Sequence, residues 1–217
     1  MQGDIVHEGA TEQARKDADE MMAFITPIAK AFLTEVGYEA ANLGMQVYGG
    51  HGFIAEWGME QIVRDTRIAL MYEGTTGIQA LDLLGRKVLM TQGESLKRFT
   101  KLVHVFCTEQ ADNEAAKEFI APLAKLNKEW GELTMKIGML AMKDREEVGS
   151  ASVDYLMYSG YAALAYFWAR MAVIAQKKLA EGTDETGFYT AKVQTARFYF
   201  KRILPRTLSH AASALGG

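Results

Sequence analysis

The stretch TPIAKAFLTEVGYEAANLGMQVYGGHG, residues 26–52, indicates the fold class most directly. Thr26 and Pro27 form a helix start signal, a hydroxyl N-cap followed by proline at the first helical position; one longer helix kinked at Pro27 is the alternative. Apolar residues then recur at helical spacing, at Ile28, Ala31, Phe32 and Val36. The three glycines within residues 49–52 end the helix, because glycine leaves the backbone unconstrained.

Helical spacing continues on both sides of this stretch. The pattern predicts helices over 11–25, 59–71, from just after Gly74 to about Met90, and then near 94–109, 112–145, 150–181 and 185–214. No segment shows a convincing strand alternation, and only three prolines occur in 217 residues. The predicted fold class is therefore all-α, an antiparallel helical bundle.

The helical pattern breaks at residues 91–93, Thr-Gln-Gly, which is the best candidate for a domain boundary. This break predicts two helical domains, residues 1–91 and residues 92–217. The start, MQGDIVHEGATEQ, reads like a linker, and the end, ASALGG, resembles a cut in a longer chain. We therefore expect the chain to be a fragment of a longer protein.

Composition excludes several classes of function. The formal net charge of -3 and the absence of a basic run argue against nucleic-acid binding. No apolar run approaches the roughly 20 residues that a transmembrane helix needs. The single cysteine, Cys107, has apolar neighbours and predicts a buried, unreactive thiol in a reducing, cytoplasmic setting. The four histidines show no ligand spacing, so we expect no metal site.

Two features are candidates for chemistry. The glycine turn at 49–52 exposes backbone N–H groups that suit a phosphate or a flat ring, but taken by itself it is better interpreted as a tight turn between helices. Glu73 lies between Tyr72 and Gly74, just before a predicted helix. It is either a helix-capping carboxylate or a general base on a short loop, where Gly74 leaves room for a substrate.

Three motifs together carry a family resemblance: Gln-Val-Tyr-Gly-Gly-His-Gly-Phe at 46–53, Arg-Asp-Thr-Arg-Ile at 64–68, and Tyr-Glu-Gly-Thr at 72–75. Their order and spacing resemble the C-terminal signature of the acyl-CoA dehydrogenase family. The sequence over 73–87 resembles the long members, whose extra helical domain corresponds to 94–217 here. The resemblance implies an FAD-dependent enzyme that oxidises acyl-CoA thioesters to trans-2-enoyl-CoA.

The resemblance also implies roles for individual residues. Glu73 matches the base that removes the α-proton, and its backbone N–H matches a donor to the enolate oxygen. Thr75 matches a contact to the FAD of its own subunit, and Gly74 and Arg86 would contact the substrate. The adenosine and diphosphate part of a neighbouring subunit's FAD would be held by Gln46, Gly49, Gly50 and Gly52.

The family further implies a homo-oligomer and an electron-transfer flavoprotein as electron acceptor. We find no β-domain for the flavin ring, so the isolated piece is expected neither to bind FAD tightly nor to turn over acyl-CoA. A fragment of an acyl-CoA oxidase and a non-catalytic packing or oligomerisation module are the alternatives. Arg64 and Asp65 are expected to join helices as a partly buried ion pair.

Overall fold

The computed structural model describes residues 11–216, and it confirms the all-α class: no strand occurs among them. The α-helices are α2 (Glu12–Val47), α3 (Gly50–Phe53), α4 (Met59–Ile68), α5 (Thr76–Leu81), α6 (Glu94–Glu109), α7 (Lys117–Ala141), α8 (Glu146–Glu181), α9 (Thr186–Phe198) and α10 (Arg206–Ala214). Short 3-10 turns lie at Ala55–Trp57 and Glu114–Ala116, and π-helical segments at Asp82–Leu89 and Tyr199–Ile203.

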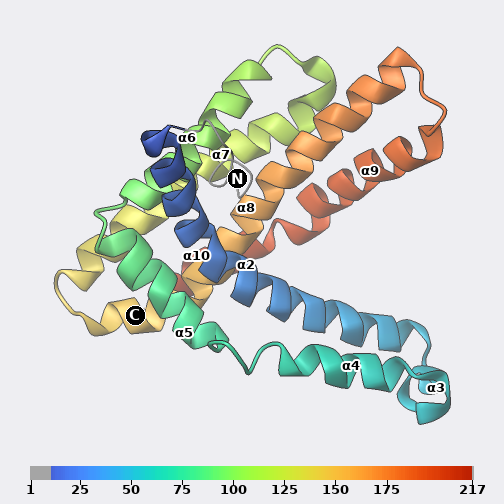
Figure 1. Ribbon diagram of the computed structural model, residues 1–217, viewed down its shortest axis with the longest axis horizontal. Helices are drawn as coiled ribbons and strands as arrows, with labels where there is room; N and C mark the ends of the chain where they lie inside the picture. The colour runs from blue at the N-terminus through green and yellow to red at the C-terminus, as the bar shows by residue number, and fades with distance from the viewer. Residues whose placement is uncertain (1–10, 217) are drawn as a thin grey trace.

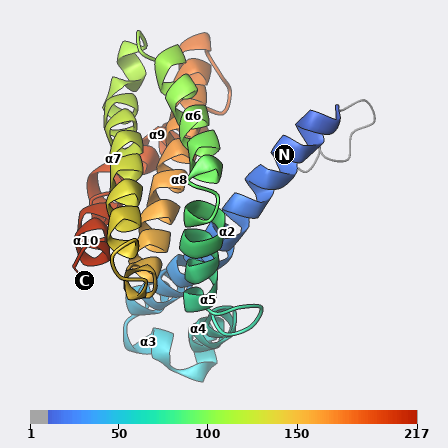
Figure 2. The ribbon, with the colours of Figure 1, turned by 90° about the vertical axis from the view of Figure 1, so that its left-hand side faces the viewer.

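Helix α8 is the centre of the molecule. It packs against α7, α9 and α10 and also against α2 and α5. Figure 2 shows α6, α7, α8 and α9 running side by side as a bundle, with α2 crossing it obliquely. The C-terminal half of α2 and all of α4 leave the bundle together as a hairpin, with α3 at its tip (Figure 1). Within residues 11–216, no helix combines the length and apolar character that a membrane crossing requires.

The predicted helix start at Thr26 is wrong, and the alternative of one longer helix holds. Helix α2 begins after Thr11, whose hydroxyl accepts a 3.1 Å hydrogen bond from the Ala14 N–H. The Thr26 hydroxyl instead donates to the Met22 carbonyl at 2.7 Å, inside the helix. The helix continues through Pro27 and bends (Figure 1), because proline removes one backbone hydrogen bond without ending the surrounding turns.

The last predicted helix, 185–214, is interrupted in the structure. Helix α9 gives way to the π-helical segment Tyr199–Ile203, and Pro205 precedes the first residue of α10. Proline has no backbone N–H to continue the hydrogen-bond ladder, so the chain starts a new helix there. The segment predicted near 94–109 is confirmed with the same ends as α6, and the remaining predicted segments are present with shifted ends.

One hydrophobic core spans the predicted boundary at residues 91–93. The boundary itself is a turn, in which Gln92 and Gly93 have φ of 54° and 80°. Buried residues from both sides belong to the same cluster, including Phe24, Leu84, Phe99, Trp130 and Tyr155. The division into 1–91 and 92–217 therefore stays a prediction, and the packing couples the two parts. Cys107 is buried as expected, and its burial raises the pKa of the thiol to about 11.

Helices α2 and α8 meet at an unusually close contact. The Phe32 ring lies over Gly160, where an added Cβ would stand only 2.2 Å from ring atoms. Phe32 also packs edge-on against Tyr161, with 4.8 Å between ring centroids. Nearby, Arg206 of α10 donates to both oxygens of Glu39 at 2.7 Å, and this pairing holds the pKa of the Glu39 carboxyl below its usual range. Helix α2 is thus tied to α8 and α10.

This contact predicts the effect of a single methyl group. Gly160→Ala should lower the free energy of unfolding by about 1–3 kcal/mol, since the core must shift to accept the added Cβ. The matched control is Gly149→Ala on the same helix, where a Cβ meets nothing within 4 Å. There, better helix propensity should stabilise by up to about 1 kcal/mol. Urea unfolding followed by circular dichroism measures both, and equal midpoints would contradict the close contact.

Candidate functional site

Glu73 lies on the short loop that joins α4 to α5, which we call the Glu73 loop, residues 69–75. Glu73 and Gly74 have φ of 56° and 89°, both in the left-handed region. A glutamate rarely adopts this conformation without a structural or functional reason. Its side chain is exposed. The loop therefore presents a carboxylate to the surface from a constrained backbone.

Two side chains from neighbouring helices hold the carbonyl groups of the Glu73 loop. The Lys30 ammonium of α2 donates to the Ala69 carbonyl at 3.1 Å and to the Gly74 carbonyl at 2.6 Å. The Gln79 amide of α5 donates to the Glu73 carbonyl at 3.2 Å. Among the hydrogen bonds of residues 11–216, none uses the Glu73 N–H. Side chains thus hold three carbonyls of the loop, while the backbone N–H groups of residues 72–75, that of Glu73 among them, have no hydrogen-bond partner within residues 11–216.

Thr75, and not Glu73, occupies the N-cap position of α5, so the interpretation of Glu73 as the cap is wrong. The Thr75 side chain makes no capping hydrogen bond and is exposed. The next residue, Thr76, donates its hydroxyl to the Glu35 carboxylate of α2. Gly74 is favoured here by its positive φ, and an added Cβ would also displace the Gln79 amide, whose nitrogen would stand 2.6 Å away. Both α2 and α5 therefore shape this loop.

The glycine turn lies at the tip of the hairpin. Gly49 has φ of 59° directly after α2, and Gly52 is buried so closely that a Cβ would stand 2.3 Å from the Met45 carbonyl oxygen. Around Gly49 and Gly50, by contrast, an added Cβ meets nothing within 4 Å. Gln46 is exposed beside them. The turn therefore has a packed inner glycine and an open backbone outside.

The glycine turn and the Glu73 loop lie at opposite ends of α4. This helix has 10 residues, so its ends are roughly 15 Å apart at 1.5 Å per residue. Arg86 is separated from Glu73 by a similar length, because it lies ten residues after Thr76, the first residue of α5. Its exposed side chain pairs with Asp82 at 3.1 Å. The predicted residues thus form two separate sites, the glycine turn and the Glu73 loop, at the two ends of α4. Arg86 belongs to neither.

The expected ion pair between Arg64 and Asp65 is wrong. Both side chains are exposed, and Asp65 accepts a 2.7 Å hydrogen bond from Gln61 of its own helix. The pair fails because adjacent helical residues do not face each other. The link from α4 to α2 comes instead from Arg67, whose guanidinium stands 5.2 Å from the ring centroid of Tyr38.

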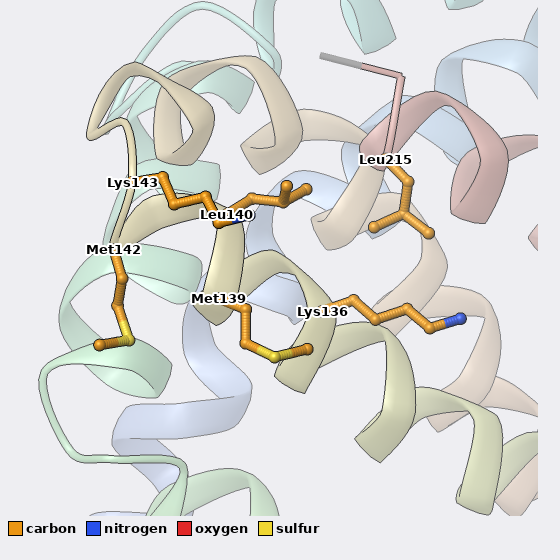
Figure 3. A pocket seen from close by; sticks show the side chains of 6 residues that line it. All are labelled: Lys136, Met139, Leu140, Met142, Lys143 and Leu215. Carbon is orange, nitrogen blue, oxygen red and sulfur yellow. The ribbon is translucent and has the colours of Figure 1, made fainter.

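A cavity of about 580 Å³ lies away from both sites, beside the C-terminal end of α7 (Figure 3). Its walls are apolar apart from two lysines, and it is lined by Lys136, Met139, Leu140, Met142, Lys143 and Leu215. It has no carboxylate or histidine, so it offers no acid–base pair. Within residues 11–216, no group of three or more acidic, histidine or cysteine side chains gathers as a metal site.

Sequence reasoning missed Lys30 and Gln79. Gln79 lies within the first turns of the helix predicted after Gly74, where a polar side chain can reach back to the chain before the helix, but its bond to the Glu73 carbonyl follows no capping pattern. Lys30 had a weaker signal, as a charged residue flanked by the buried positions Ile28 and Ala31. Its partners are 39 and 44 residues away in sequence, so no local pattern identifies them.

Comparison with known proteins defines the class of this chain. Residues 7–89 match the family model of the acyl-CoA dehydrogenase C-terminal domain, and residues 99–217 match the model described as acetyl-CoA dehydrogenase C-terminal like. The chain therefore belongs to the acyl-CoA dehydrogenase family.

Individual relatives match over nearly the whole chain. The 3-methylmercaptopropionyl-CoA dehydrogenase of Ruegeria pomeroyi is 38% identical over 198 residues, which cover 91% of this chain and 34% of the relative. The broad-specificity linear acyl-CoA dehydrogenase FadE5 of Mycobacterium tuberculosis is 32% identical over 210 residues, 93% of this chain and 34% of the relative. A butyryl-CoA dehydrogenase of Syntrophomonas wolfei is 27% identical over 93% of this chain and 33% of its own length. The chain thus spans about a third of the length of these curated relatives.

The packing of the glycine turn leads to a prediction. Gly52→Ala should loosen the turn, because the added Cβ collides with the rigid Met45 carbonyl. Chymotrypsin cleavage after Tyr48 and Phe53 should then become about tenfold faster, as local opening becomes easier. The control is Gly50→Ala, where the Cβ meets nothing within 4 Å. Mass spectrometry of timed digests gives both rates, and equal rates in the two variants would refute the collision.

Proposed function

We propose that this chain is the C-terminal helical part of an FAD-dependent acyl-CoA dehydrogenase, an enzyme of fatty acid metabolism that oxidises acyl-CoA thioesters to trans-2-enoyl-CoA. Glu73 is the base that removes the α-proton. The observation that carries the proposal is the Glu73 loop itself. Its left-handed backbone presents a carboxylate, Lys30 and Gln79 hold three of its carbonyls, and the Glu73 N–H has no partner within residues 11–216.

The chemistry requires both the carboxylate and the free N–H. The α-C–H of a thioester is a weak acid, and its proton passes to a Glu73 carboxylate oxygen as negative charge develops on the thioester oxygen. A backbone N–H aimed at that oxygen lowers the barrier, because charge that forms in the transition state gains most from a fixed donor. The two contributions come from one residue, so the geometry of its backbone sets both.

The residues present fit FAD in part. Gly49 and Gly50 leave an open backbone that suits the diphosphate, Gln46 is exposed beside them, and the Thr75 hydroxyl is free of capping duty. When bound, FAD accepts the hydride from the β-carbon. We propose two flavin contacts, one from Thr75 to the FAD of its own subunit and one from the glycine turn, roughly 15 Å away along α4, to the FAD of a neighbouring subunit. We therefore propose a homo-oligomer.

The described residues include no strand that could form a flavin-binding β-domain. We propose that this stretch alone neither binds FAD tightly nor turns over acyl-CoA, and that an electron-transfer flavoprotein reoxidises the complete enzyme. Two relatives are named for butyryl-CoA and 3-methylmercaptopropionyl-CoA, whose acyl groups differ in length and polarity. An acyl-CoA thioester is accordingly the substrate class that we propose.

A second, structural role is proposed for residues 94–217. Helix α8 covers α2 and α5 and contacts the π-helical segment Asp82–Leu89 that continues α5. The buried residues of these helices share one cluster with Phe32 and Leu84. This packing supports a structural role in which residues 94–217 hold the helices that position the Glu73 loop. They contribute none of the proposed catalytic groups.

The base is tested by Glu73→Gln in the native-length flavoprotein. The amide keeps the shape of the side chain but cannot take a proton, so flavin reduction by acyl-CoA should slow by about 10²–10⁴-fold. Stopped-flow absorbance of the flavin measures this rate. Glu56→Gln is the control, because Glu56 is an exposed carboxylate on the same hairpin, and the flavin of this variant should be reduced at the normal rate. A normal rate in Glu73→Gln would remove Glu73 from the mechanism.

A further inference from the structure

We propose that Lys30 is a positioning residue for the reaction. Its ammonium group clamps the two ends of the Glu73 loop and so fixes the backbone that orients the base. The contribution to catalysis rests on the function proposed above, whereas the clamp itself is a property of this chain and is tested separately.

The two acceptors of Lys30 occupy key positions on either side of Glu73. Ala69 is the C-cap of α4, where unpaired carbonyls and the negative end of the helix dipole favour a cation. Gly74 directly precedes Thr75, the N-cap of α5. A single ammonium bonded to both carbonyls, at 3.1 and 2.6 Å, therefore links the end of one helix to the start of the next.

Lysine suits this task because its ammonium carries three donors on a compact charge. Hydrogen bonds from a charged donor are shorter and stronger than neutral ones, and the 2.6 Å contact to Gly74 is of this kind. Lys30 is partly buried on α2, two residues before Phe32, which is fixed against Gly160. The Lys30 backbone is thus held beside the close contact between α2 and α8.

The clamp restrains an unfavourable conformation. Glu73, with φ of 56°, relaxes toward right-handed backbone if its neighbours allow it. The Gly74 carbonyl belongs to the residue after Glu73, so holding it in place resists that rotation. Gln79 restrains the Glu73 carbonyl as well, but through a neutral amide at 3.2 Å. The stronger restraint is therefore Lys30, and without it the N–H and carboxylate of Glu73 lose their shared orientation.

The clamp is tested in the 217-residue chain by hydrogen exchange. The Leu70 and Met71 amides donate to Arg67 and Ile68 at 3.2 and 3.0 Å within the turn that Lys30 closes. Lys30→Met should speed their exchange by about 10- to 100-fold, because a charged hydrogen-bond donor is lost. Lys30→Arg, which keeps charge and donors, should restore most of the protection. Lys16→Met, an exposed lysine on the same helix, is the control and should leave exchange unchanged.

The catalytic consequence is tested in the native-length flavoprotein. Lys30→Met should lower the maximal rate of flavin reduction by about 10- to 100-fold while KM for acyl-CoA changes little, since misplacing a reacting group costs rate more than binding. Lys30→Arg should recover the rate. If Lys30 had only a structural role, Lys30→Met would lower thermal stability but would not lower kcat selectively relative to KM.

The outcomes separate the two ideas. Unchanged exchange at Leu70 and Met71 in Lys30→Met overturns the clamp, whatever the enzyme does. Faster exchange with an unchanged rate of flavin reduction overturns the positioning role. If Glu73→Gln retains full activity, the proposed function fails, while the exchange result still decides whether Lys30 holds the loop.

Discussion

The close contact of α2 with α8 at Phe32 and Gly160 is the constraint on which the rest of the structure depends. Helix α2 has 36 residues and reaches from the bundle to the glycine turn. Its buried residues end at Phe32, and beyond that point the hairpin of α2 and α4 buries only Gly52 before Leu70. The direction in which the hairpin leaves the bundle is therefore set by packing near Phe32. Each side chain that holds the Glu73 loop from α2 lies within three residues of that anchor.

Burial and electrostatics contribute to different parts of this arrangement. The ion pairs of the bundle, such as Arg98 with Asp17 and Arg197 with Glu118, are largely exposed and add little to stability. The polar contacts that set the geometry of the Glu73 loop are instead those to its backbone carbonyls and the contact between Thr76 and the Glu35 carboxylate. Lys30 holds both ends of the Glu73 loop, Gln79 holds the Glu73 carbonyl, and Thr76 ties the start of α5 to Glu35. Leu70 is the one buried residue of the loop. A small number of hydrogen bonds thus fixes the conformation of this loop, whereas burial of apolar side chains fixes the helices of the bundle.

The sequence predicted the presence of the helices better than the residues at which they begin, end or merge. Helical periodicity identified the all-α class, and the motif around Glu73 located a loop that the structure shows in an unusual backbone conformation. Thr26 misled because a hydroxyl before proline resembles a helix start, whereas inside a helix the same hydroxyl bonds to the preceding turn. The role of Lys30 was beyond prediction, since it depends on two carbonyls that tertiary structure alone brings near.

The coupling between the bundle and the Glu73 loop explains why residues 94–217 would matter to the reaction proposed above, to which they contribute none of the proposed catalytic groups. Helix α8 contacts α2 through Gly160 and also supports α5 and its π-helical continuation. These are the two elements from which Lys30 and Gln79 reach the loop. A shift of α8 would therefore move both restraints in the same direction, and the backbone of Glu73 would follow them. Packing at the centre of the bundle is in this way a determinant of geometry at its edge.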